Sequence, residues 1–295
     1  MPYIGEISAL VTACLWSVTS FLFAFAAEKV GSVQVNINRI ILAAIILFFI
    51  VVLSGIDYTL SSSQVMYLII SGVVGLVIGD SFLFKSYQLI GARLGMIMMS
   101  LVPAISAVLA WVFLEEFITP LGIIGMVITI SGVILVVTEK AQGAVKKNFD
   151  KIGILYGFLG AAGQAGGLIL AKLAFAESYV NGFVASFARL SSAGIIILAG
   201  GMLLRRYRNP VKTYRNEIPA LKATIAATVL APVLGVTLSL VAIEFTKVGI
   251  ASTLMALVPI IMLPISKYYY KEKLSLRAIS GAVIAVAGVI ILFLR

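Results

Sequence analysis

The chain has 295 residues, of which 61% are hydrophobic and only 12% are charged, and its 22 Lys and Arg against 12 Asp and Glu give a net charge of +10. Soluble domains average about 25% charged and about 45–50% apolar residues. Together with a mean hydropathy of +1.14, this composition excludes an ordinary water-soluble fold. The basic charge does not indicate a nucleic-acid partner, because no basic stretch sits on a soluble module that could present it.

Several chemistries are also disfavoured by composition. Histidine is absent, which removes the commonest general base and metal ligand. The single cysteine, Cys14, cannot form an internal disulfide. No pattern of paired acids or of Ser with Lys at catalytic spacing is present, so we expect no enzyme, no cofactor and no metal.

Ten stretches of mostly apolar residues predict ten membrane-spanning helices. In chain order they cover 3–25, 33–54, 64–86, 93–114, 119–138, 152–174, 181–204, 219–243, 249–270 and 275–294. The first has no basic segment before it and no cleavage site after it, so we expect a retained helix rather than a signal peptide. The connecting segments are too short to fold as domains.

An internal repeat divides the chain into two halves. At an offset of 156 residues, the LVP at 101–103 matches the LVP at 257–259, and Gly79 matches Gly235. Glu116 matches Glu272 at the same offset, which favours a structural role for both at a helix end. The repeat predicts three segments: a first five-helix repeat at 1–138, a central basic link at 139–151, and a second five-helix repeat at 152–295.

The odd number of helices in each repeat predicts that the second repeat enters the membrane inverted relative to the first. The distribution of charge agrees, since 17 of the 22 basic residues fall on links at one face of the predicted bundle. Under the positive-inside rule this face is cytoplasmic and both termini are outside. The predicted fold class is an all-α integral membrane protein of ten transmembrane helices in two inverted five-helix repeats.

Four segments carry a resemblance to a known family. They are LWSVTSF (15–21), GVVGLVIGDSFLFKSYQLIGARLG (72–95), LVPAISAVLAWVFLEEF (101–117) and its echo LVPIIMLPISKYYYKEKL (257–274). With this doubled pattern, nearly the whole chain resembles EamA-type transporters of the drug/metabolite transporter superfamily. The resemblance implies a ten-helix secondary transporter with a central cavity and does not name a substrate, because the family carries amino acids, other metabolites and drugs.

Polar residues within the predicted helices are candidates for lining such a cavity. These candidates are Trp16, Ser17, Thr19, Ser20, Asp80 and Gln164. The alternative for the hydroxyls is that each bonds to a carbonyl one turn back in its own helix. Asp80 lies in a largely apolar stretch, which suits proton coupling, binding of an amine, or a static ion pair with Arg39 or Lys85.

Three further charges lie inside or at the ends of predicted helices. Arg39 and Arg189 pair between the repeats at an offset of 150 residues, each about seven or eight residues into its helix. A charge at that depth must face protein, water or a partner, so each arginine either stabilises the fold or binds substrate. Glu244, at the end of the eighth helix, is a weaker candidate than Asp80 for coupling.

Pro103 and Pro259 fall near the middle of the fourth and ninth predicted helices, where each removes a backbone donor from the carbonyl of Met99 or Met255. We expect them to act as gating kinks, or as static kinks that shape the cavity.

The sequence predicts a secondary active transporter of small organic solutes that exports them by alternating access. The alternative is a lipid-handling or passive pore-type membrane protein. The expected partners are a small-molecule substrate, membrane lipid and a coupling proton or other ion, and the expected location is the cell membrane. The glycines at 125, 132, 281 and 288 predict close helix packing, within a monomer or in a homodimer.

Overall fold

The computed structural model describes residues 3–138, 150–269 and 275–294, and over these residues the chain forms helices and short connections. The first half contains α1 (Ile4–Val30), α2 (Ser32–Leu53), α3 (Ser62–Gly72), the π-helix η1 (Val73–Gly79), α4 (Asp80–Met99), α5 (Val102–Leu114) and α6 (Pro120–Val137). The second half contains α7 (Lys151–Glu177), α8 (Gly182–Leu203), α9 (Pro210–Tyr214), α10 (Ile218–Thr228), the π-helix η2 (Val229–Gly235), α11 (Val236–Phe245), α12 (Val248–Met255), α13 (Val258–Tyr269) and α14 (Leu276–Phe293).

Nine helical stretches in the described part of the chain are long and apolar enough to cross a membrane. The fourth predicted span, 93–114, is different, because the helix found there, α5, has only 13 residues. The link that we predicted at 87–92 is not found: helix α4 continues to Met99, and the chain turns at Ser100 and Leu101 before α5 begins. Periodicity alone cannot place this break, since apolar residues continue on both sides of it.

The repeat seen in the sequence reappears in the positions of the helices. Elements α3 and α10, η1 and η2, α4 and α11, α5 and α13, and α6 and α14 each begin 156 residues apart. Helices α2 and α8 begin 150 residues apart. Both halves therefore interrupt their third crossing with a π-helical segment at the same place.

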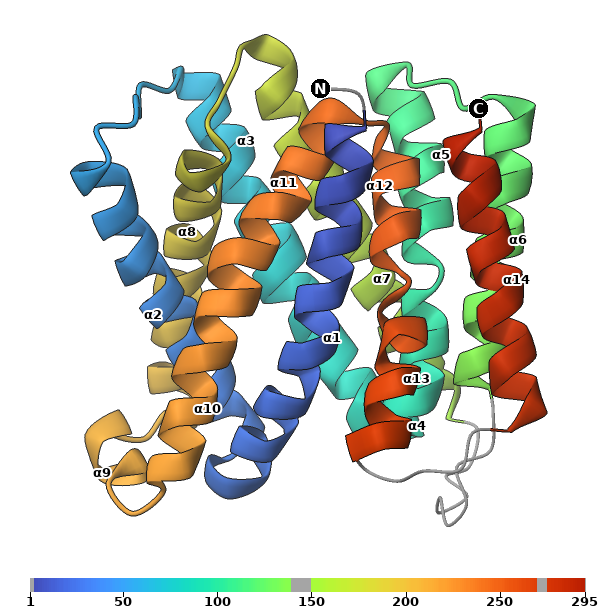
Figure 1. Ribbon diagram of the computed structural model, residues 1–295. Coiled ribbons are helices and arrows are strands. Elements are labelled where there is room, and N and C mark those ends of the chain that lie inside the picture. The colour runs from blue at the N-terminus through green and yellow to red at the C-terminus, as the bar shows by residue number, and fades with distance from the viewer. Residues whose placement is uncertain (1–2, 139–149, 270–274, 295) are drawn as a thin grey trace.

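The two halves run through the bundle in opposite directions. Thr246 donates a hydrogen bond from Oγ1 to Glu6 Oε1 (3.0 Å) at the start of α1. The carbonyl of Thr246 accepts from Lys172 near the end of α7 (3.5 Å). The start of α1 and the end of α7 therefore lie at the same end of the bundle, which is also the end that holds the N- and C-termini (Figure 1).

Packing between the halves follows the inversion. Helix α7 packs along α3, η1 and α4 of the first half, while α1 packs along α10, η2 and α11 of the second. Helix α6 lies beside α14 (Figure 1). A Cβ added at Gly132 would lie 2.5 Å from the backbone nitrogen of Ala285, and one at Gly288 would lie 2.5 Å from that of Thr129. The glycine pairs predicted from the sequence thus serve packing within one chain.

Candidate functional site

A buried carboxylate links the two halves near the middle of the bundle. Asp80 is the first residue of α4 and is only 8% exposed. Its Oδ2 lies 3.3 Å from Arg39 Nη2 of α2, and its Oδ1 accepts a hydrogen bond of 2.6 Å from Gln164 Nε2 of α7. Because Arg39 belongs to the first half and Gln164 to the second, any relative movement of the halves changes the environment of Asp80.

Arg39 is held from three sides. Its Nε donates to Asn36 Oδ1 (2.8 Å), one turn earlier in α2. Its guanidinium carbon lies 5.2 Å from the ring centroid of Phe23 in α1, within the range of a cation–π contact. With the Asp80 ion pair, these contacts satisfy the charge that we expected to need a partner.

The π-helix η1 positions Gln164 against Asp80. The Gln164 amide also donates to the carbonyl of Gly75 (3.1 Å) in η1, so one side chain contacts both the irregular turn and the carboxylate. A Cβ added at Gly79 would lie 3.2 Å from the Gln164 backbone nitrogen, so this close approach of α7 to η1 relies on glycine. Such π-helical turns are frequent at functional sites.

Arg189, the counterpart of Arg39, differs from it in its contacts. It is 3% exposed, and its Nε is buried without a hydrogen-bond partner. Its Nη2 lies 3.3 Å from the position that a Cβ of Gly75 would occupy. Arg189 therefore reaches the same π-helical turn as Gln164, the residue that bonds both to the carbonyl of Gly75 and to Asp80.

The hydroxyl groups predicted to line the cavity bond mainly to their own helix. Thr19 donates to the carbonyl of Leu15 (2.9 Å), and Ser20 donates to that of Trp16 (2.7 Å). Ser17 donates to Ala13 O within α1 (2.6 Å) and also reaches the carbonyl of Val258, the first residue of α13 (3.1 Å). These contacts match the alternative of local satisfaction.

Trp16 and Gln164 occupy matching places in the two halves. Gly235 ends η2 as Gly79 ends η1, and a Cβ added at Gly235 would lie 2.6 Å from Trp16 Nε1. The first helix of each half thus meets the π-helix of the other half at a glycine. The structure brings Asp80, Gln164 and Arg39 together and places Trp16 at the equivalent position of the opposite π-helix.

The structure corrects the expected position of the two prolines. Pro103 and Pro259 are the second residues of α5 and α13 rather than mid-helix kinks. The preceding helices end at Met99 and Met255, which are the residues whose carbonyls lose the proline N–H donor. Each LVP segment therefore breaks its helix instead of bending it.

A second polar cluster lies at the end of the bundle that holds the termini. Lys172 Nζ lies 3.6 Å from Glu116 Oε1, and it also donates to the backbone carbonyl of Glu244 (3.1 Å). Glu116 Oε2 accepts from the N–H of Val248, the first residue of α12 (2.8 Å). Sequence reasoning missed Lys172, although a lysine within a predicted span was a usable signal. Glu244 belongs to this cluster, and Glu272 lies outside the described residues.

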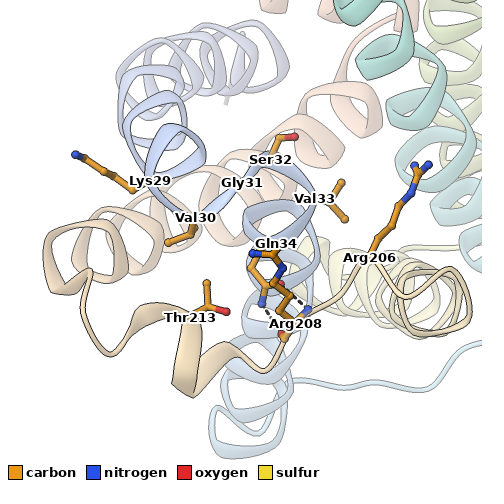
Figure 2. Close-up of a pocket in the computed structure, with 9 residues that line it drawn as sticks. All are labelled: Lys29, Val30, Gly31, Ser32, Val33, Gln34, Arg206, Arg208 and Thr213. Atoms are coloured by element: carbon orange, nitrogen blue, oxygen red, sulfur yellow. Dashed lines mark hydrogen bonds between the residues drawn. The ribbon is translucent and has the colours of Figure 1, made fainter.

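A cavity of about 590 Å³ lies at the opposite end of the bundle, between the α1–α2 turn and the segment before α9 (Figure 2). Three basic side chains, those of Lys29, Arg206 and Arg208, contribute to its lining. Gln34 fixes its wall by a reciprocal pair of 2.9 Å hydrogen bonds, from Gln34 Nε2 to Arg208 O and from Arg208 N to Gln34 Oε1. Among the described residues, those that line the cavity include no acidic one.

A duplicated, inverted helical bundle with a charged cluster between its halves defines a polytopic membrane transporter. The EamA-like transporter family matches residues 3–138 and 151–294, and the chain belongs to this family. It is thus a multi-pass membrane protein that transports small solutes, and it is not an enzyme. A solved structure described as "Crystal structure of protein" is similar over 98% of this chain and 96% of its own, with a TM-score of 0.78 and 14% identity. No curated protein sequence matches.

Proposed function

We propose that the protein is a secondary active transporter in the cell membrane that exports small organic solutes by alternating access between its two halves. The observation that carries the proposal is the position of Asp80, whose two oxygens contact Arg39 of one half and Gln164 of the other. A carboxylate shared in this way binds an ion or proton differently in the two arrangements of the halves.

Coupling in this proposal runs through Asp80. Protonation of the carboxylate removes the charge that faces Arg39 and weakens the bond from Gln164. The bond between the halves is then weaker, so proton binding favours their separation. Pro103 and Pro259, at the two helix breaks, allow α5 and α13 to move separately from the helices before them.

The test is transport by purified protein in liposomes with an imposed proton gradient and a panel of amino acids, amines and organic acids. We expect gradient-dependent accumulation of at least one class of solute, and Asp80→Asn to uncouple it from the gradient. Gradient-independent leakage of many unrelated solutes would instead support the alternative of a passive pore. Movement of labelled phospholipid between leaflets, without transport of any solute, would support a lipid-handling protein.

Membrane lipid is a proposed partner at the basic cavity. Lys29, Arg206 and Arg208 are among the residues that line a cavity of about 590 Å³, and basic residues gathered at a membrane surface attract anionic lipid. The orientation of this basic face in the membrane is tested by cysteine labelling. If the face is cytoplasmic, a cysteine introduced as Asn209→Cys in a Cys14→Ser background is labelled only after the cells are opened. Labelling of this cysteine in intact cells would show the opposite orientation.

A further inference from the structure

The two halves place an arginine at the same position and differ in what faces it. Arg39 is the eighth residue of α2, and Arg189 is the eighth residue of α8. In the first half the partner is Asp80, the first residue of α4. The corresponding first residue of α11 is Val236, so the second half supplies no carboxylate at the matching position.

One buried nitrogen of the Arg189 guanidinium also lacks a hydrogen-bond partner. Arg189 is 3% exposed, and the nitrogen without a partner is Nε. The oxygens of Asp80, the nearby carboxylate, are already engaged with Arg39 and Gln164. The two ion pairs among the described residues are Arg39 with Asp80 and Lys172 with Glu116, and neither includes Arg189.

Among the described side chains around η1, this arrangement gives two arginines, Arg39 and Arg189, for one carboxylate, Asp80. Arg39 pairs with Asp80, and Arg189 reaches Gly75 of η1, whose carbonyl bonds to Gln164, the other partner of Asp80. A buried charge without a paired, hydrogen-bonded partner is costly in a protein interior and more so within a membrane. A ligand with a negative group would relieve that cost, whereas a cationic ligand would add to it.

We propose that Arg189 binds the carboxylate group of the transported solute, which is therefore an organic carboxylate. The inference rests on the proposed transport function and names its substrate class. The planar guanidinium matches a carboxylate through two parallel hydrogen bonds. The solute's carboxylate pairs with Arg189 as Asp80 pairs with Arg39. Because Arg189 is buried here, the solute reaches it when the halves separate.

The test is thermal stabilisation of the purified protein in detergent. The probes are a series of aliphatic and aromatic carboxylates of increasing size, each compared with its primary amide and with the primary amine of the same carbon skeleton. We expect at least one carboxylate to raise the melting temperature in a concentration-dependent way, with little effect from its amide or amine. Equal stabilisation by the amide or the amine, or none by any carboxylate, would overturn the proposal.

Variants then assign the effect to Arg189. Arg189→Gln is expected to abolish stabilisation by the carboxylate, and Arg189→Lys, which keeps the charge but not the planar fork, to weaken the apparent affinity about tenfold. Arg215→Gln is the control, because Arg215 is exposed just after α9 and its removal changes the net charge equally. An unchanged response in folded Arg189→Gln would contradict the assignment.

A variant that adds the missing carboxylate beside Arg189 provides an independent test. Val236→Asp supplies a carboxylate at the position that matches Asp80, and it is expected to suppress stabilisation by added carboxylate. If this variant fails to fold, Arg189→Lys still carries the test. Gradient-driven transport of amines or neutral solutes alone would leave the proposed function intact and contradict this inference. Stabilisation by carboxylates without transport of any solute would contradict the proposed function instead.

Discussion

Lys172 and Glu116 form an ion pair of 3.6 Å between the two halves of the protein. Their side chains are 18% and 13% exposed, so the pair is shielded from water. Lys172 bonds to a carbonyl at the end of α11, and Glu116 bonds to the first N–H of α12. The pair thereby holds the junction between these helices, which lies at the end of the bundle opposite the α1–α2 turn and α9 (Figure 1), the elements that flank the basic cavity.

Removing Glu116 should destabilise the protein. We expect Glu116→Ala to lower the free energy of unfolding by about 2–3 kcal/mol, because a shielded lysine loses its ion pair and a helix N-terminus loses its acceptor. Thermal unfolding in detergent measures the effect, with Glu28→Ala at an exposed position of α1 as the control. A double-mutant cycle with Lys172→Met isolates the contribution of the ion pair to stability. Equal destabilisation by Glu116→Ala and Glu28→Ala would contradict the role of Glu116.

Replacing Asp80 should change the pH dependence of transport. Asp80→Asn keeps a similar shape, but its side chain cannot lose a proton or form an ion pair with Arg39. We therefore expect the pH profile of transport to become flat. Asp57→Asn serves as the control, because Asp57 is exposed and bonds locally to Thr59. Hydrogen bonds from Thr59 lower the pKa of Asp57, so this control should leave the profile unchanged. A profile that persists in Asp80→Asn would exclude Asp80 from coupling.

The glycine contact between α6 and α14 should not tolerate a side chain. Gly132→Ala places a methyl group 2.5 Å from a backbone nitrogen of α14, so the helices must move apart, at a cost of about 1–3 kcal/mol. Gly200→Ala in α8 meets nothing within 4 Å and should be neutral or slightly stabilising. The melting temperatures of the two variants provide the comparison, and a stable Gly132→Ala protein would refute the close contact.

The proline breaks should affect transport more than stability. Pro259→Ala supplies a donor for the carbonyl of Met255 and favours a continuous α12–α13 helix. We expect slower transport with an unchanged or higher melting temperature. Pro120→Ala, at the first position of α6, should have no effect on rate, since that N–H has no partner within the helix. A transport rate in Pro259→Ala equal to that of the wild-type protein would argue against a gating role for the break between α12 and α13.

Much of the fold follows from patterns along the chain. Apolar runs predict most of the spans because each must bury its backbone polar groups within a helix. The 156-residue offset predicts the duplication and, with an odd number of helices, the inversion. The break at Met99 was not predicted, because the apolar run continues through it and only the local geometry before Pro103 ends the helix.

The sequence by itself determined that this is a duplicated helical membrane protein, because hydropathy and repeat register are properties of the linear chain. It also singled out Asp80, Arg39, Gln164 and Arg189, since polar groups in apolar runs are costly without partners. Only the tertiary structure decided which of them meet. Asp80 bonds to Arg39 and to Gln164, 84 positions away, while the Arg189 Nε has no partner. Those contacts depend on the packing of α7 and α8 against η1 and on the reach of Arg39 from α2 to the start of α4, which no local pattern specifies.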